Sequence, residues 1–287
     1  MSDSVWEDFI ALNSTAELNT RVLGPVSDYL ALRDRSVLWD ETKIPLMEAA
    51  QKDHAPLPLE EDREGYYGAN HFNYWASGLR DWLQITEWLE QRQITVTSAL
   101  DIGCASGRLV RHWQAQTDMQ QVIGCDINRL HVDWVSRYLP ESIMVFQNSS
   151  LPTLPLADES LDLITAFSVF THVESFDTTW LMELRRVLRP GGIAWLTVHS
   201  DRTWHEMAPD WPLYQALKNN QDFKMIRELP ELPQDRTIIR WQKERSYSAN
   251  VFYRESYLRR VWGRILKFED IFPGLPNYQD VVVLRKH

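Results

Sequence analysis

A short loop of small residues, Asp101 to Gly107, is the part of the sequence with the clearest chemical character. It reads DIGCASG and lies between an apolar segment and a segment with helical spacing. Gly103 and Gly107 have no Cβ, so the backbone can turn sharply and a ligand can approach it closely. The helix start expected at Arg108 offers free N–H groups to a carboxylate or a pyrophosphate. The loop predicts a nucleotide-type ligand held at a helix N-terminus.

A second acidic position narrows the kind of ligand. Asp126 ends the next apolar segment, VIGCD, 19 residues after Gly107, where a carboxylate can hold both hydroxyls of a ribose. A dinucleotide fingerprint would read GxGxxG, whereas Gly103 and Gly107 are spaced as GxxxG with Asp101 just ahead. Because an acid at this place favours a positive charge over a pyrophosphate, the pattern indicates a cofactor with a sulfonium or ammonium group.

Two histidines are candidates for proton transfer. His172 follows the segment FSVFT, directly after a predicted strand, and is our candidate for a general base or a contact to the acceptor. The alternative is that it caps the next helix or hydrogen-bonds a loop. His199 ends another predicted strand, and Asp201, two residues later, can form a histidine–carboxylate pair with it. A purely structural role for His199 is the alternative.

An aromatic segment, YYGANHFNYWASG, precedes the loop. Trp75 or Tyr74 can face a cationic cofactor group through a cation–π contact. Ser77, together with Gly78, can meet a carboxylate of the same cofactor. Packing against the core is the alternative for all these rings.

The elements that position these residues are predicted from the hydrophobic pattern. Residues 1–95 are predicted to form a helical N-terminal cap, with Leu79 to Trp88 as its best helix. From residue 96 to 200, short apolar runs alternate with helical ones, which indicates a doubly wound parallel sheet. The predicted strands are 97–101, 121–125, 142–146, 161–167 and 193–199, and the predicted helices are 107–117, 128–139 and 176–188.

The rest of the chain departs from this rhythm. Residues 201–247 contain four prolines and three tryptophans and are predicted to form an inserted lid over the acceptor. Residues 248–287 are predicted to supply a helix at 255–265 and an antiparallel pair of strands at 266–271 and 280–286. The expected fold is therefore α/β, a Rossmann-like doubly wound sheet of seven strands.

Four motifs in this order resemble those of the class I methyltransferases that depend on S-adenosylmethionine (SAM). The family motif [DE]xGxxxG is matched by Asp101, Gly103 and Gly107, and Asp126 matches its ribose-binding acid. The blocks LPLADESLDLITAFSVFTHV and ELRRVLRPGGIAWLTVHS resemble the family's segments around strands four and five. The segments FYRESYLRRVWGRI and DVVVLRK weakly resemble bacterial methyltransferases of glycan or natural-product pathways.

The resemblance implies SAM as the cofactor, with S-adenosylhomocysteine as its product. We also expect Ile127 and Phe167 to contact the cofactor, Phe167 as a wall of its pocket. At the adenine site the family often has an aspartate, whereas this chain reads NSSLPTLPL. The amide oxygen of Asn148 can accept the adenine amino group there, and Ser149 can assist.

Composition limits the partners. The formal charge of −10 over 287 residues disfavours a broad nucleic-acid surface, and no apolar run is long enough for a membrane span. The start MSDSVWEDFI does not resemble a signal peptide, so we expect a cytoplasmic protein. Two cysteines are too few for a cysteine-based metal site, and no metal is expected. The oligomeric state is not predicted.

We therefore expect a SAM-dependent methyltransferase that methylates a hydroxyl of a small molecule, a sugar or a peptide-like natural product. N-methylation is an alternative chemistry. An RNA or protein methyltransferase is an alternative within the same class of enzyme. A dinucleotide-dependent oxidoreductase and a SAM-binding protein without catalysis are alternatives from other classes.

Overall fold

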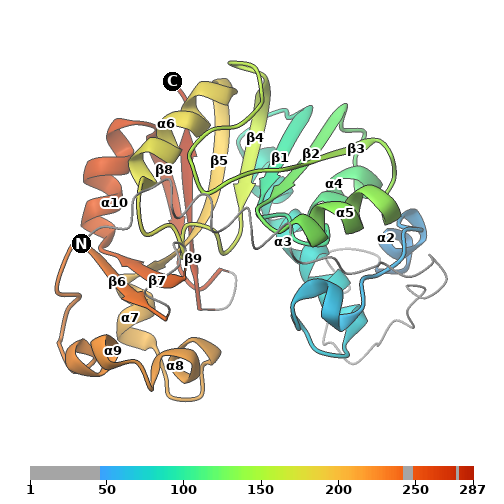
Figure 1. The fold of residues 1–287 in the computed structure, drawn as a ribbon. Coiled ribbons are helices and arrows are strands. Elements are labelled where there is room, and N and C mark those ends of the chain that lie inside the picture. The colour runs from blue at the N-terminus through green and yellow to red at the C-terminus, as the bar shows by residue number, and fades with distance from the viewer. Residues whose placement is uncertain (1–45, 242–247, 276–277) are drawn as a thin grey trace. The chain divides into compact units, whose positions relative to one another are not determined.

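The computed structural model describes residues 46–241, 248–275 and 278–287 (Figure 1). The parts of the predicted cap and lid at residues 1–45 and 242–247 lie outside them. The described chain falls into two compact units, residues 46–148 and the residues from Ser149 onward. Each unit is described by itself.

The first unit contains three parallel strands in the order β3-β2-β1, namely β1 (Ser98–Ile102), β2 (Gln121–Asp126) and β3 (Ile143–Gln147). Their register pairs Ile102 with Cys125 and Asp126 with Gln147, so the carboxyl ends meet at one edge of the sheet. The crossovers carry α4 (Val110–Gln116) and α5 (Arg129–Tyr138). β1 is buried along its whole length, including the polar residues Ser98 and Asp101.

Helices precede this sheet. They are α2 (Leu46–Lys52), the short 3₁₀ helix η2 (Glu60–Arg63) and α3 (His71–Gln91). The side chain of Asn70 caps α3 by accepting a hydrogen bond from the Asn73 amide at 2.9 Å. The helix is therefore longer than the segment predicted from its apolar positions. A Cβ at Gly78 would lie 2.1 Å from the Arg108 carbonyl oxygen, so only glycine lets α3 approach the start of α4 this closely.

The second unit is built around the long strand β5 (Leu188–Ser200). It pairs in parallel with β4 (Leu161–Ala166) and β7 (Ala249–Tyr253), and antiparallel with β9 (Asp280–Arg285). β9 also pairs antiparallel with β8 (Lys267–Phe272). β7 in turn pairs antiparallel with β6 (Arg236–Arg240). The helix α6 (Asp177–Val187) connects β4 to β5, and α10 (Glu255–Val261) with η3 (Trp262–Arg264) connects β7 to β8.

The predicted lid region folds into three short helices and the strand β6. The helices are α7 (Asp201–Glu206), α8 (Pro212–Leu217) and α9 (Gln221–Ile226), and they group beside the hairpin of β6 and β7 (Figure 1). Trp204, Leu217 and Phe223 from these helices pack with Ile239 and Phe252 from the two strands in one buried cluster. Residues 201–240 therefore share a small buried core with β7.

The α/β class of the fold is confirmed, while the number of strands is nine among the described residues and not seven. The two unexpected strands are β6 and β7. Each has five residues and lies among prolines and charges, so the sequence pattern gave no period long enough to predict them. α4 also begins at Val110 and not at Arg108, because Gly103 to Gly107 form an extended turn of their own.

Candidate functional site

The loop after β1 has an unusual backbone. Gly103, Ala105 and Gly107 have φ angles of +69°, +47° and +80°, and the Gly103 amide donates to the Cys125 carbonyl at 2.8 Å. Positive φ strains a residue with a Cβ such as Ala105, and such strain is concentrated at functional sites. A Cβ at Gly107 would lie 2.4 Å from Cδ1 of Leu139, so this glycine is also required for packing. Asp101 is buried near the end of β1, directly before the loop.

Asp126 is held in a fixed orientation beside this loop. Its Oδ2 accepts the Ala105 amide at 2.9 Å, and its Oδ1 accepts the Asn128 amide at 2.8 Å. A carboxylate has about four acceptor sites, so each oxygen keeps about one lone pair for a further donor. Two hydrogen-bond acceptors are what the two hydroxyls of a ribose need. The residues present therefore fit the ribose of SAM.

Three residues that the sequence analysis did not single out surround Asp126. Glu64 Oε1 accepts a hydrogen bond from Asn128 Nδ2 at 2.9 Å and lies 3.8 Å from Nε2 of His131. Nδ1 of His131 lies 3.5 Å from Oδ2 of Asp126. Burial lowers the pKa of His131, but Asp126, Glu64 and Asp62 outweigh this effect, so the net pKa is raised. No spacing motif joins Glu64 to His131, and only the fold brings them together.

The aromatic segment is mostly buried in helix packing. The Trp75 side chain is fully buried, donates from Nε1 to Asp53 Oδ2 at 2.7 Å, and contacts the His112 ring edge to face. Ser77 Oγ donates its proton to the Tyr74 carbonyl at 2.8 Å and lies 3.3 Å from Arg108 Nη1. The predicted cofactor contacts of Trp75 and Ser77 stay predictions.

The other predicted cofactor residues follow three strands. Ile127 is partly exposed directly after β2, and the Asn148 amide, just after β3, donates to the Asp126 carbonyl at 3.1 Å. In the second unit, Ser149 Oγ accepts the Leu151 amide at 3.3 Å, and Phe167 follows β4 half-buried. Ile127 and Asn148 therefore lie in the same unit as the loop, near Asp126.

His172 lies in the loop after β4 in the second unit. Its Nδ1 lies 2.6 Å from the Ala249 carbonyl oxygen, and because a carbonyl only accepts, Nδ1 carries the proton of the neutral ring. The ring packs against Trp241 with 5.3 Å between centroids. Burial lowers the pKa of His172 below its ordinary value, with the Ala249 hydrogen bond opposing. The ring is thus neutral at pH 7, and Nε2 has the lone pair.

His199 lies near the end of β5 and is almost fully buried. Its ring lies between Phe252 and Tyr278, with centroid distances of 5.1 and 6.1 Å. Burial and, to a smaller extent, the nearby His172 lower the pKa of His199 to about 3, while the Val251 backbone opposes this shift. Within the described residues, neither ring nitrogen has a hydrogen-bond partner.

The predicted pair of His199 and Asp201 is not formed. The Asp201 carboxylate instead accepts the Glu255 amide at the start of α10, with distances of 3.3 and 3.4 Å. β5 ends at Ser200 and α7 begins at Asp201, so the chain turns between the two side chains. His199 is therefore a neutral ring without a carboxylate partner at this position.

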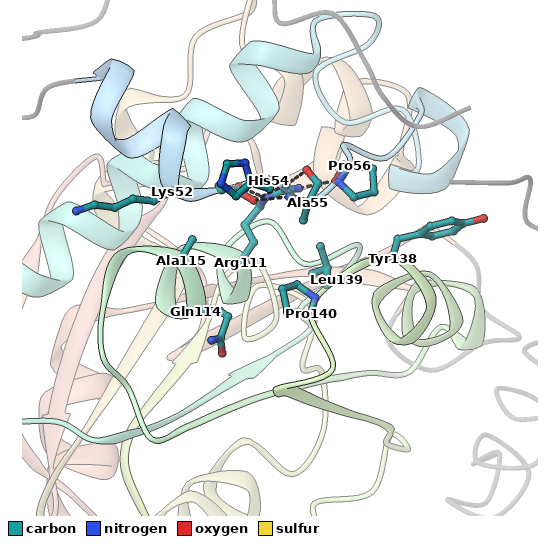
Figure 2. Close-up of a pocket in the computed structure, with 11 residues that line it drawn as sticks. Lys52, His54, Ala55, Pro56, Arg111, Gln114, Ala115, Tyr138, Leu139 and Pro140 are labelled. Atoms are coloured by element: carbon teal, nitrogen blue, oxygen red, sulfur yellow. Dashed lines mark hydrogen bonds and ion pairs between the residues drawn. The ribbon is translucent and has the colours of Figure 1, made fainter. Parts of the chain in front are cut away.

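A cleft of about 500 Å³ lies in the first unit, and none of the predicted site residues lines it (Figure 2). It is bordered by residues 52–56, one side of α4 and the end of α5. Arg111 and Asp53 lie on its wall as an ion pair, with Nε 2.6 Å from Oδ2 and Nη2 3.1 Å from Oδ1. Because both side chains are nearly fully buried, the pair connects residue 53 firmly to α4.

Comparison with known proteins gave one family match and a set of similar solved structures. Residues 100–196 match the family described as methyltransferase domain. No curated protein sequence matched the chain. Three similar solved structures are SAM-dependent methyltransferases from Methanosarcina mazei, Mesorhizobium loti and Aquifex aeolicus, with 19%, 15% and 16% identity. The matches cover 66%, 70% and 67% of this chain and 92%, 97% and 82% of the others, with TM-scores of 0.46, 0.49 and 0.45.

The α/β fold and the family match define a class I methyltransferase. The chain is a SAM-dependent methyltransferase, and SAM is its cofactor. In the described ranges, no group of three or more histidine, cysteine, aspartate or glutamate residues is arranged to hold a metal ion. No helix of the described chain has the length and apolar character needed to cross a membrane.

Proposed function

We propose that the enzyme transfers the methyl group of SAM to a hydroxyl of a small molecule, a sugar or a peptide-like natural product, with His172 as the general base. A hydroxyl must lose its proton as it attacks the methyl group, so a base within reach accelerates the step. SAM supplies the activated methyl group, and the protein's own residues hold both reactants in line.

The observation that carries the proposal is the hydrogen bond from His172 Nδ1–H to the Ala249 carbonyl at 2.6 Å. This bond fixes the tautomer and the ring orientation, and it leaves Nε2 as the acceptor of a proton. His199, neutral and without a partner among the described residues, is our candidate for a hydrogen bond to the same acceptor molecule. Trp241 and Tyr278 supply apolar walls beside the two rings.

The test is a methyl-transfer assay with labelled SAM and a panel of phenols, sugars and hydroxylated peptides. Once an acceptor is found, His172→Gln should lower kcat by roughly 10²- to 10⁴-fold, the usual contribution of a general base. Its affinity for S-adenosylhomocysteine should not change. The wild-type rate should rise with pH and reach half its maximum below about pH 6.5, because the neutral ring is the base and burial lowers the pKa of His172.

The matched control is His205→Gln, which changes a histidine exposed on α7 and should leave kcat unchanged. Equal activity of the His172 variant and the wild type would refute the role of His172. Transfer to amines but to no hydroxyl would refute O-methylation. Thermal stabilisation by NAD and not by S-adenosylhomocysteine would contradict the cofactor assignment itself.

A further inference from the structure

Arg63, at the end of η2, is a buried cation without an anionic partner in the described chain. Only 1% of its surface is exposed. Its Nη1 lies 2.9 Å from the Pro58 carbonyl oxygen and 3.0 Å from His71 Nδ1, and its Nη2 donates to the Gly68 carbonyl. Burial lowers the pKa of Arg63, while Tyr74, Glu60 and Asp62 oppose this effect. None of these acids pairs with it, although buried charges in proteins are normally paired.

Two N–H groups of Arg63 remain available. A guanidinium has five N–H donors, and three of them are used by Pro58, His71 and Gly68. Nε has no partner among the described residues, and it shares one edge of the guanidinium with Nη2. That edge is the one with which Arg111 binds both oxygens of Asp53. The same edge of Arg63 can bind a carboxylate in the same way.

Tyr74 offers a further donor at the same place. The Arg63 guanidinium carbon lies 5.1 Å from the centroid of the Tyr74 ring, and the phenol oxygen is buried without a partner in the described residues. Burial raises the pKa of Tyr74, and the positive charges of Arg111, Arg108 and Arg63 oppose this shift. The phenol therefore keeps its proton and can donate it. A buried donor left without an acceptor costs stability, so a ligand that satisfies it is bound more tightly.

This place is connected to the cofactor loop. Ser106 Oγ, within the loop, donates to the carbonyl of Asp62, the residue directly before Arg63. Ser77, one helical turn after Tyr74, lies within hydrogen-bond distance of Arg108 at the end of the loop. The donors and the loop therefore belong to one connected part of the first unit.

We propose that Arg63 and Tyr74 bind the carboxylate of the amino-acid end of SAM. This inference rests on SAM being the cofactor. The turn from Glu64 to Gly68 contacts both side chains, because Arg63 Nη2 donates to the Gly68 carbonyl and the Tyr67 ring lies 6.4 Å from the Tyr74 ring between centroids. Four of its residues, Glu64, Gly65, Tyr67 and Gly68, have φ between +49° and +78°. The carboxylate reaches the donors when this turn shifts, and it then accepts hydrogen bonds from the edge of the Arg63 guanidinium that includes Nε.

The test measures binding by calorimetry with three ligands that differ at this end. S-Adenosylhomocysteine has both the carboxylate and the amine. Decarboxylated SAM has the amine but no carboxylate, and 5′-methylthioadenosine has neither group. Arg63→Gln should weaken the binding of S-adenosylhomocysteine roughly 10- to 100-fold, which is the range expected for losing hydrogen bonds to a charged group. The other two ligands should bind as they do to the wild type.

Tyr74→Phe keeps the ring under Arg63 and should weaken S-adenosylhomocysteine by about 3- to 10-fold, with methylthioadenosine unchanged. If Arg63→Gln does not fold, Tyr74→Phe still tests the proposal. The hydroxyl that it deletes has no hydrogen-bond partner in the described chain, so the variant should fold. Tyr214→Phe and Arg129→Gln make the same changes at a tyrosine of the second unit and at an exposed arginine, and should have no effect.

If the variants weaken the binding of all three ligands equally, or weaken the binding of none, the proposal is overturned, because these side chains then do not bind the carboxylate. Failure of the wild type to bind S-adenosylhomocysteine at all would overturn the cofactor assignment, and this inference with it. The two failures are therefore distinguishable.

Discussion

Arg111 and Arg63 are two buried arginines in the same unit, and they differ in the groups that surround the guanidinium. Each has 1% of its surface exposed. Arg111 binds both oxygens of Asp53 and also donates to the carbonyls of Ala55 and Pro56. Arg63 has backbone carbonyls, one histidine nitrogen and the face of Tyr74, and no carboxylate among the described residues.

The difference separates a structural arginine from a candidate ligand-binding one. A buried ion pair costs a great deal when one partner is lost, because the other charge is left without compensation. Arg111 therefore connects residues 53–56 to α4. For Arg63 the missing anion is a property of the site, and a ligand can supply it.

The largest expected effect is on the Arg111 pair. Asp53→Asn should lower the free energy of unfolding by about 3–5 kcal/mol, because it leaves the Arg111 charge buried and uncompensated. Urea unfolding measures this change. Asp133→Asn, in the exposed pair with Arg129, is the matched control and should cost less than about 0.5 kcal/mol. A loss below about 1 kcal/mol for Asp53→Asn would mean that the pair does not hold the structure.

The next effect depends on pH through His112, which neighbours Arg111 and donates to the Trp75 carbonyl. Burial lowers the pKa of His112 to about 3, although the Asp53 charge opposes this. Between pH 6.5 and 3 the unfolded chain therefore binds more protons than the folded one. The contribution of His112 to stability is full above pH 6.5 and is lost as the pH falls toward 3.

From pH 7 to pH 5 this loss amounts to about 2 kcal/mol in the wild type. His112→Gln should remove it, which unfolding in urea at the two pH values would show. His71, beside Arg63, is less buried, and His71→Gln should change the pH dependence less. The same pH dependence in His112→Gln and in the wild type would contradict the prediction.

The smallest effect is expected for the stability of the Arg63 site without ligand. Arg63→Met loses hydrogen bonds to two carbonyls but also removes an uncompensated charge, so the free energy of unfolding should fall by less than about 1.5 kcal/mol. Arg111→Met leaves Asp53 unpaired and should cost about 3–5 kcal/mol. Thermal or urea unfolding compares the two directly. Equal losses would indicate that Arg63, like Arg111, serves only the fold.

Much of the α/β fold could be predicted because its elements are encoded locally. The strands β1 to β5 and their helices lie close to the predicted ranges, since buried parallel strands are continuous apolar runs and their helices repeat with a period near 3.6. β6 and β7 could not be predicted in this way. β7 pairs with β5 and β6 pairs with β7, and short strands of this kind are defined by their partners more than by their own pattern.

The candidate site divides in the same way. The spacing of Asp101, Gly103, Gly107 and Asp126 predicted the cofactor loop, because a tight turn needs glycines and a ribose needs an acid at the end of the next strand. The pairing of His199 with Asp201 was wrong, because closeness in sequence does not place two side chains together where a strand turns into a helix.

The sequence by itself determined the class of protein, since the loop and the following acid depend on local backbone geometry that a short motif encodes. Only the tertiary structure decided which charges meet. Asp53 lies 58 residues from Arg111 and still pairs with it, whereas Glu60 and Asp62, close in sequence to Arg63, do not pair with that arginine. Electrostatic energy depends on distance in space and on burial, and neither can be read from spacing along the chain.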